Sequence, residues 1–348
     1  MITPRTPAAS APPRLTVPED TFTDSSCYHA ALGTLLVEHD SGAEPELTLG
    51  NTVATRAHKA ERGPVFGDLV PALLTSMAAR GHRVERRRIT DDGARQGLID
   101  ALRGGAAVVV VVDTFYLDHY WVDRGRVHAL HALTVRDFRP SDGTVRLVDA
   151  VDLVFADDRV PLSRLEPALL ASDIGQSWLR ITEWGTDEAA ADAGSAEELT
   201  AHADVLAGQG TDELSGVELA LWTRDSLDEL FALTPRLAKP EARSGTDDER
   251  RLVTRLMRGM WNYHHTLRWF ARYLRAVPAG STASRTAPAV ERASQDWLAA
   301  RSMLLHSGLA NPARTARYRD EVARRLDRVA GDLRAAGDLI GVHPEGPE

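Results

Sequence analysis

Hydrophobic residues recur at helical spacing close to the start of the chain. The stretch SCYHAALGTLLVEH (26–39) places four apolar side chains on one helical face, those of Ala31, Leu32, Leu35 and Leu36. Asp24, Ser25 or Ser26 can cap this helix, because short polar side chains accept hydrogen bonds from the free N–H groups of a first helical turn. The pattern therefore predicts a helix that has Cys27 close to its beginning.

The segments that follow combine amphipathic helices with β-branched runs. Helices are predicted at 66–80, where Gly81 ends the helix, and at 94–105. The run AAVVVVVDTFYL (106–117) is continuous, as expected for a strand buried on both faces. The other predicted strands are 82–90, the antiparallel pair 131–138 and 144–151 around the turn RPSDG, the first part of 154–172 (with a short helix after it) and 177–184. Helices followed by a mainly antiparallel sheet indicate an α+β fold.

The composition changes near residue 187, where an Ala- and acid-rich stretch runs into helical patterns. The longest of these spans 247–277, and its apolar residues recur at steps of three and four: Leu252, Leu256, Met260, Tyr263, Leu267, Phe270 and Leu274. Two further helices are predicted at about 288–307 and 312–339. We therefore expect a disordered leader (1–19), an α+β domain (20–186) and an all-α helical domain (187–348).

The charge and the apolar runs exclude several classes of protein. The net charge of −9 argues against binding to nucleic acid or to an anionic membrane, since both require a basic face. The longest apolar run, AAVVVVVDTF, has the length of a strand, whereas a bilayer span needs about 20 residues. The single cysteine, Cys27, cannot form an internal disulfide, which fits the reducing cytoplasm. We expect a cytoplasmic protein.

Cys27 is the first candidate for chemistry. Cysteine attacks as a thiolate, which is favoured by the partial positive charge of a helix N-terminus and by an imidazolium. His131 opens the first strand of the predicted hairpin, and Asp149 lies near the end of the partner strand. These two strand ends lie side by side, so Asp149 can accept a hydrogen bond from His131 and orient the ring toward Cys27.

Other polar residues compete for these roles or extend the site. His128 is the rival of His131 as base, and Asp137 and Asp152 are rivals of Asp149. The stretch DTFYLDHYWV (113–122) is either a packed strand end or a loop that faces substrate; in the second case Tyr116 and Asp113 contact the substrate, and the acid attracts an amine. His29 lies about 200° around the helix from Cys27, where it forms a wall of the site or lies on the surface.

The sequence indicates neither a metal nor a cofactor. His264 and His265 are adjacent, so in a regular helix they point about 100° apart and cannot both serve one metal. Neither a Walker pattern nor GxGxxG occurs in the chain. We expect no metal and no cofactor.

Three stretches together carry a resemblance: DSSCYHAALGTLL, VVVVVDTFYLDHYW and HALHALTVRDF with GTVRLVDAVD. They resemble the N-terminal domain of the butirosin biosynthesis protein H family, a papain-like branch related to bacteriocin-processing cysteine peptidases. The resemblance covers about residues 20–160. It implies that Cys27 is the nucleophile, His131 the general base and Asp149 its orienting partner.

The resemblance also implies a reaction in natural-product (antibiotic-type) biosynthesis. An acyl group would pass from the thioester of an acyl carrier protein, through an acyl-enzyme at Cys27, to a small-molecule amine acceptor. Papain-like peptidases carry a Gln about six residues before the cysteine, and Thr21 stands there in this chain. That departure disfavours a peptidase. Hydrolysis of a thioester or amide by the same residues, and a non-catalytic member of the fold that binds a ligand or partner, stay open as alternatives.

Overall fold

The computed structural model describes residues 22, 25–53, 57–60, 63–121, 123–126, 128–151, 155–170, 176–185, 194–208, 213–233, 247–277 and 281–341. The predicted leader (1–19), Thr21, the alternative cap Asp24 and the rival acid Asp152 lie outside these residues.

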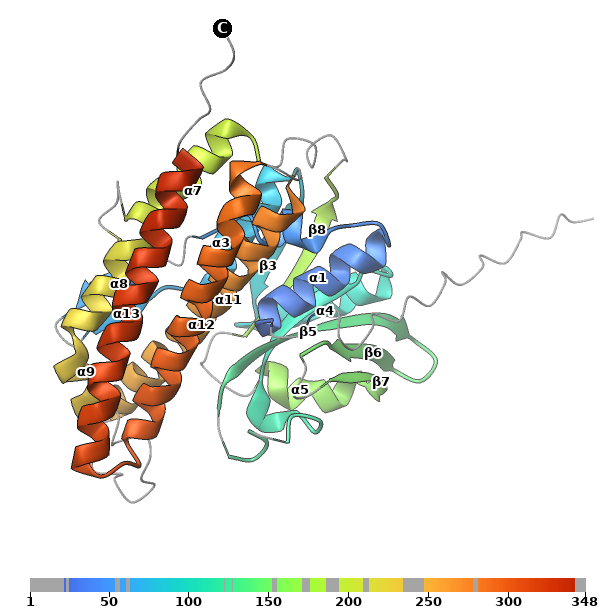
Figure 1. The fold of residues 1–348 in the computed structure, drawn as a ribbon. Coiled ribbons are helices and arrows are strands. Elements are labelled where there is room, and N and C mark those ends of the chain that lie inside the picture. The colour runs from blue at the N-terminus through green and yellow to red at the C-terminus, as the bar shows by residue number, and fades with distance from the viewer. Residues whose placement is uncertain are drawn as a thin grey trace, which may run out of the picture.

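The structure is a mixed α+β fold followed by a helical region, as the pattern predicted (Figure 1). The helices of the first region are α1 (Cys27–His39), α2 (Pro45–Leu49), α3 (Leu69–Ala79), α4 (Asp92–Arg103), the 3-10 turn η1 (Thr114–Tyr116) and α5 (Leu162–Leu170). Its strands are β1 (Ala57–Ala60), β2 (Gly63–Phe66), β3 (Arg83–Arg88), β4 (Val108–Asp113), β5 (Leu130–Arg139), β6 (Thr144–Asp149), β7 (Ala156–Pro161) and β8 (Ser177–Glu183). The second region contains α7 (Ala196–Ala207), α8 (Gly216–Asp225), α9 (Leu227–Leu233), α11 (Asp247–Ala276), α12 (Thr282–Ser307) and α13 (Pro312–Gly341).

Six of the described strands form one antiparallel sheet in the order β3-β8-β4-β5-β6-β7. Its centre is β4, and every side chain of this strand is buried. Val109 and Val111 pack in the layer that contains α1 and α3, whereas Val108, Val110 and Val112 face the layer that contains α4 and α5. The continuous apolar run is therefore a strand covered on both faces, as predicted.

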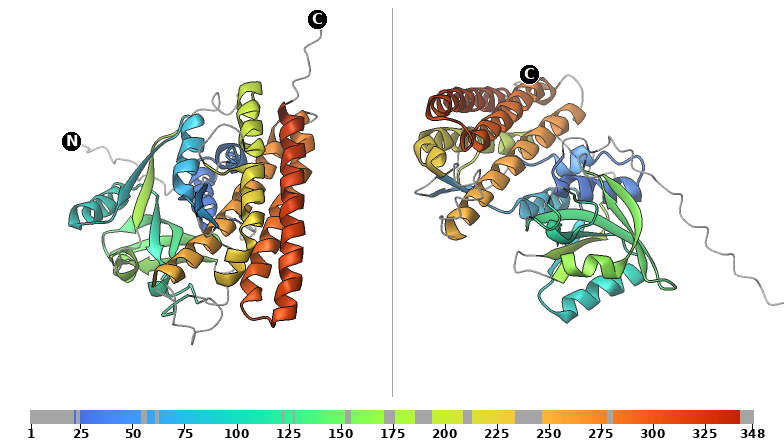
Figure 2. Two further views of the ribbon diagram at one scale, coloured as in Figure 1. Left: turned by 90° about the vertical axis from the view of Figure 1, so that its left-hand side faces the viewer. Right: turned by 90° about the horizontal axis from the view of Figure 1, so that it is seen from below.

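In the second region, the predicted apolar stripe of the long helix forms the core. Leu256, Met260, Tyr263, Leu267, Phe270 and Leu274 are all buried there. The helices α11, α12 and α13 lie roughly parallel or antiparallel to one another, and α7 and α8 pack against α13 (Figures 1 and 2). No helix among the described residues is long and apolar enough to cross a membrane.

Several elements differ from the sequence-based expectation. The helix α2, the hairpin β1–β2 and the helices α8 and α9 were not predicted; all of them are short. The helix α12 begins at Thr282 rather than near 288, because Ser281 caps it and Pro288 lies inside the helix instead of before it. A proline at that point removes one backbone donor but does not end the helix.

The two regions are in close contact along α11. Trp269 of α11 is fully buried in the core that contains α1, and its indole Nε1 donates a hydrogen bond to the Ser25 hydroxyl over 3.1 Å. Near the middle of α11, a side chain at Gly259 would meet the ring of Phe66 on β2, because an added Cβ would lie 2.1 Å from that ring. A glycine in this helix therefore permits the close approach of the hairpin.

Candidate functional site

The helix α1 presents Cys27 at its first turn. Ser26 is the N-cap, with extended backbone angles, and its hydroxyl accepts a hydrogen bond from the His29 N–H over 3.3 Å. Thr134 of β5 donates a hydrogen bond to the Ala31 carbonyl over 3.1 Å, which fixes α1 against the sheet. Cys27 is partly exposed at the positive end of this helix. The helix therefore places the sulfur where a negative charge is favoured.

His131 and Asp149 lie together on the neighbouring strands β5 and β6. Thr134 pairs with Val148 in this ladder, so His131 and Asp149 are diagonal neighbours on one face. The His131 Nε2 and the Asp149 Oδ2 are 2.7 Å apart, and both side chains are buried. Cys27 lies near this ring, since its side chain contributes to the raised pKa of His131 and both residues line the same cavity.

The charges of His131 and Asp149 stabilise each other. Burial by itself would lower the pKa of His131, but the charge of Asp149 and its hydrogen bond, together with Cys27, raise that pKa to about 10. Burial by itself would raise the pKa of Asp149, but the positive charge of His131 and the hydrogen bonds from His119 and His131 lower it. At neutral pH, His131 is therefore an imidazolium beside the sulfur and Asp149 is a carboxylate behind it.

His119 also contacts Asp149, and the sequence alone predicted no role for it. It follows β4 in a loop, and its Nε2 lies 2.9 Å from the same Oδ2 atom of Asp149. The next residue, Tyr120, packs against the His131 ring with 4.6 Å between the ring centroids. The stretch DTFYLDHYWV (113–122), which contains both residues, is rich in aromatic and titratable side chains. Only the path of the loop shows that His119 reaches Asp149.

A cavity of about 460 Å³ opens over Cys27. One wall belongs to the first region and contains Ser25, Ser26, Cys27, Tyr28, Tyr120, Ala129, Leu130, His131 and Val151. The opposite wall belongs to α11 and α12 and contains Thr254, Met257, Arg258, Trp261, Asn262, Arg301 and Leu305. The cavity is therefore built between the two regions, with the sulfur and the imidazole on one side only.

Three predicted substrate contacts do not line this cavity. Asp113 is fully buried, and its carboxylate accepts hydrogen bonds from the Phe115 N–H and from His128, whose Nδ1 is 2.7 Å away. Tyr116 packs against the rings of Phe115 and His128. The structure therefore places these two side chains in the packed strand end, the first of the two interpretations of this stretch, and outside the described lining of the cavity over Cys27.

His29 is also directed away from the cavity. It is fully buried, its Nδ1 lies 2.8 Å from the Ser26 hydroxyl, and its ring stacks on that of Trp269 at 4.8 Å. Burial, with a smaller contribution from Arg272, lowers the pKa of His29 to about 3. The imidazole is therefore neutral at ordinary pH, and it supports α1 against α11.

The structure also separates the chosen residues from their described rivals. His128 bonds to Asp113, and its side chain is half exposed, away from the lining of the cavity. Asp137 has a positive φ of 51° in the irregular part of β5 and lies near Arg136. His264 is buried against Ser294 of α12. Among the described residues, no cluster of three or more His, Cys, Asp or Glu side chains has the arrangement of a metal site.

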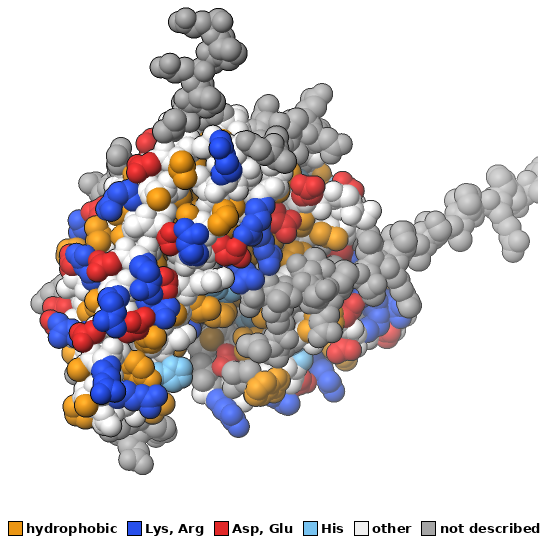
Figure 3. All heavy atoms as spheres, viewed as in Figure 1, with side chains coloured by type: hydrophobic (Ala, Val, Ile, Leu, Met, Phe, Trp, Pro, Cys, Tyr) orange, Lys and Arg blue, Asp and Glu red, His pale blue; other side chains and the backbone are white. Residues whose placement is uncertain are grey.

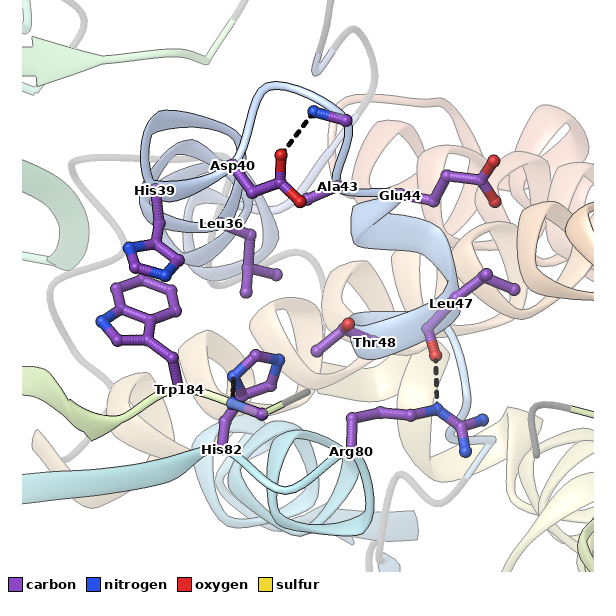
Figure 4. Close-up of a pocket in the computed structure, with 12 residues that line it drawn as sticks. Leu36, His39, Asp40, Ala43, Glu44, Leu47, Thr48, Arg80, His82 and Trp184 are labelled. Atoms are coloured by element: carbon purple, nitrogen blue, oxygen red, sulfur yellow. Dashed lines mark hydrogen bonds between the residues drawn. The ribbon is translucent and has the colours of Figure 1, made fainter. Parts of the chain in front are cut away.

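A second cavity, of about 540 Å³, lies at the other end of α1 (Figure 4). His39 stacks flat on Trp184 there, with 3.6 Å between the ring centroids, and His82 accepts a hydrogen bond from the Gly185 N–H. Arg80 donates to the Leu47 carbonyl and to Glu198. The described residues that line this cavity include imidazoles but no thiol, so the nucleophile belongs to the first cavity.

No protein-family model matches this chain, and the search of curated proteins finds no match.

Proposed function

We propose that this protein is an acyltransferase that carries an acyl group on Cys27. The observation that supports this most directly is that Cys27 and His131 line one cavity, with Asp149 hydrogen-bonded to His131 behind it. A nucleophile, a base and a group that orients the base are the minimum that acyl transfer through a thioester needs.

In the first half of the reaction, the Cys27 sulfur attacks the carbonyl carbon of a thioester donor. At neutral pH His131 is an imidazolium beside the sulfur, because its pKa is raised to about 10, and the reacting form of Cys27 is the thiolate. A carbon–sulfur bond forms to Cys27 and the bond to the donor's sulfur breaks. The departing thiolate takes the proton from His131, so the first product leaves as a thiol.

In the second half, an amine attacks the acyl-enzyme. His131, now neutral, accepts a proton from the amine as the carbon–nitrogen bond forms. The bond to Cys27 breaks and the sulfur returns to the thiolate beside the imidazolium. Water in place of the amine would make the same residues a hydrolase, and a peptide carbonyl in place of the thioester would make them a peptidase.

The negative charge on the carbonyl oxygen needs donors near Cys27. The Cys27 backbone N–H at the start of α1 is one of them. The two neighbouring hydroxyls are already engaged, Ser25 by Trp269 and Ser26 by His29. Asn262 of α11 is the one side-chain amide among the described residues that line the cavity, and we assign the second donor to it.

The resemblance to the butirosin biosynthesis protein H family suggests the partners. The donor would be an acyl group on an acyl carrier protein, the acceptor a small-molecule amine, and the setting the cytoplasmic biosynthesis of an antibiotic-type product. None of these steps calls for a metal or an organic cofactor. The cavity over Cys27 has the size for an acyl chain and a small acceptor group.

Intact-mass analysis tests the proposal. Incubation with hexanoyl-N-acetylcysteamine should add one hexanoyl group to the protein, and Cys27→Ala should abolish the adduct because the chain has no other cysteine. His131→Gln should slow its formation by about 10²-fold or more. His306→Gln, which changes an exposed histidine of α12, should leave the rate unchanged.

A second incubation, of the isolated acyl-enzyme, distinguishes the possible reactions. Loss of the adduct to a panel of primary amines, faster than to water, supports a transferase. Loss to water alone makes the protein a hydrolase. If wild-type protein forms no adduct with any thioester, the covalent reaction is excluded and a binding role remains.

A further inference from the structure

The wall of the cavity that faces Cys27 carries two arginines. Arg258 lies one turn after Thr254 on the cavity side of α11, and Arg301 lies on α12, one turn before Leu305. None of the described residues that line the cavity is an aspartate or a glutamate. Arg258 and Arg301 therefore bring two positive charges to the lining, in a chain whose net charge is −9.

Arg301 is held in place without a neutralising partner. Its Nε donates to the Met257 carbonyl over 2.9 Å, and its guanidinium lies 5.0 Å from the centroid of the Trp261 ring. Burial lowers its pKa to about 10, and no carboxylate of the described residues lies within 4 Å of it. The terminal nitrogens stay available as a planar pair of donors, the geometry that binds a carboxylate or phosphate.

Arginines on the outer face of α12 and α13 are different. Arg325 and Arg328 of α13 both bind Asp296 of α12, and Arg292 binds Asp332 at 2.6 Å. Figure 3 shows positive and negative side chains beside one another on this side of the molecule. A partly desolvated cation costs free energy unless an anion compensates it, so the arginines of the cavity differ from the ordinary pattern of these helices.

Arg258 acts on the end of the cavity where the nucleophile lies. Tyr28, the neighbour of Cys27, is buried, which raises its pKa, and the positive charge of Arg258 works against that rise. The guanidinium is therefore within electrostatic reach of the first turn of α1. Trp261 and Asn262 lie between the two arginines on the same wall.

We propose that the molecule that loads Cys27 carries an anionic group, a carboxylate or a phosphate, which Arg258 and Arg301 bind. This inference rests on the proposed acyl transfer and adds its substrate class. A donor without the anion would leave the buried Arg301 guanidinium without a compensating charge, and the free energy lost in that way would provide the selectivity. The positive lining would also attract an anionic donor to an otherwise negative protein.

The anion can belong to the acyl group or to the thiol that leaves. Three donors separate these sources: hexanoyl-pantetheine, which is neutral; adipoyl-pantetheine, which adds a carboxylate to the acyl end; and hexanoyl-phosphopantetheine, which adds a phosphate to the thiol. We expect one of the two anionic donors to acylate Cys27 at least tenfold faster than the neutral donor. Arg258→Gln and Arg301→Gln should remove most of that preference.

Alkylation of Cys27 tests the arginines without any acyl transfer. Iodoacetate and iodoacetamide differ by one negative charge, and in both cases the sulfur displaces iodide. Since Cys27 is the only cysteine, the mass of the protein reports its modification alone. The ratio of the iodoacetate rate to the iodoacetamide rate should fall about fivefold for each arginine replaced by glutamine.

Arg314→Gln is the matched control. Arg314 also lies over an aromatic ring, that of Tyr318, but it is exposed on α13 and is not part of the cavity lining. The ratio should not change in this variant. Arg301→Lys, which keeps the charge but loses the planar pair of donors, should restore the alkylation ratio more fully than the preference among the three donors.

The outcomes separate the two proposals. If thioesters acylate Cys27 but anionic and neutral donors react equally in wild type and variants, the anion site is wrong and the acyl transfer stands. If no thioester acylates Cys27 and the alkylation ratio still depends on both arginines, the acyl transfer is wrong and the anion site stands. A ratio that is the same in all variants overturns the inference.

Discussion

One carboxylate oxygen of Asp149 contacts two imidazoles. His131 and His119 both direct their Nε2 atoms to its Oδ2, while Oδ1 is buried and has no hydrogen-bond partner among the described residues. A carboxylate in this position stabilises positive charge on either ring. It therefore fixes the direction of the His131 ring and also the protonation state in which that ring meets the sulfur.

The pH dependence of acylation should report this arrangement. Because the pKa of His131 is raised to about 10, the imidazolium persists at lower pH and is lost as the pH rises through that value. Acylation needs that proton for the departing thiol, so the rate constant for adduct formation should decline above about pH 10. The measurement is the initial rate of the intact-mass adduct from pH 6 to pH 11.

Asp149→Asn should move this decline to lower pH. Burial lowers the pKa of His131, and without the carboxylate nothing of similar strength opposes it. The rate constant near pH 8 should drop by about 10² to 10⁴-fold. Asp142→Asn, which removes an exposed turn carboxylate, serves as the control. A decline that stays near pH 10 in Asp149→Asn would contradict the assigned role of the carboxylate.

At the scale of single elements, Gly259 shows how α11 meets the hairpin β1–β2. Alanine normally stabilises a helix relative to glycine by about 1 kcal/mol. At Gly259 the added methyl group would lie 2.1 Å from the Phe66 side chain, so it must displace a packed ring. Gly259→Ala should therefore lower the free energy of unfolding by about 1–3 kcal/mol, measured by denaturant titration.

The same substitution in α13 provides a matched control. No atom lies within 4 Å of a Cβ added at Gly331, so Gly331→Ala should raise the free energy of unfolding by about 0.5–1 kcal/mol. In a Phe66→Leu background, Gly259→Ala should cost less than it does in wild type. Equal effects of the two alanines would show that the hairpin does not restrict α11.

The sequence predicted the elements that have a local pattern, and it missed those whose positions depend on packing against distant parts of the chain. The helix α1, the strand β4 and the pair β5–β6 carry their patterns locally, in apolar spacing, β-branched runs and a turn. The helix α2 and the strands β1 and β2 are four or five residues long. Their positions depend on packing against α11, which no local pattern contains.

The candidate site divides in the same way. Cys27, His131 and Asp149 could be chosen because a helix start and two adjacent strand ends are local features whose meeting follows from strand pairing. His119 lies in an irregular loop, so its approach to Asp149 could not be predicted. Arg258 and Arg301 belong to a helix face that becomes a cavity wall only once α11 lies beside α1.

At the scale of the whole molecule, Trp269 connects the two regions. It belongs to α11, yet it is fully buried in the core around α1, where it stacks with Phe22 and His29 and donates to Ser25. A large aromatic side chain of this kind contributes about 3–5 kcal/mol when it is fully packed. Because these contacts contribute that much free energy, the stability of one region depends on whether the other region is folded.

We expect the two regions to unfold together in denaturant. Far-UV circular dichroism follows the helices, and the alkylation rate of Cys27 follows the first region. The two transitions should coincide in wild type. Trp269→Ala should separate them, with Cys27 becoming reactive at lower denaturant concentration than the helices unfold.

Leu333→Ala is the control for this experiment. Leu333 is fully buried in the helical core and does not belong to the core around α1. Its loss should shift both transitions together. Separate transitions in wild type would show that Trp269 does not couple the regions.

The division of the cavity into two walls has a consequence for how this protein could diversify. Bond making and breaking depend on α1, β5 and β6, while the face opposite is supplied by α11 and α12 from more than a hundred residues further along the chain. Random changes at Thr254, Arg258 and Arg301 would alter which molecule is accepted and leave Cys27, His131, Asp149 and the proposed carbonyl-oxygen donor Asn262 untouched. A library confined to these three codons is therefore a compact route to new specificities on an unchanged catalyst.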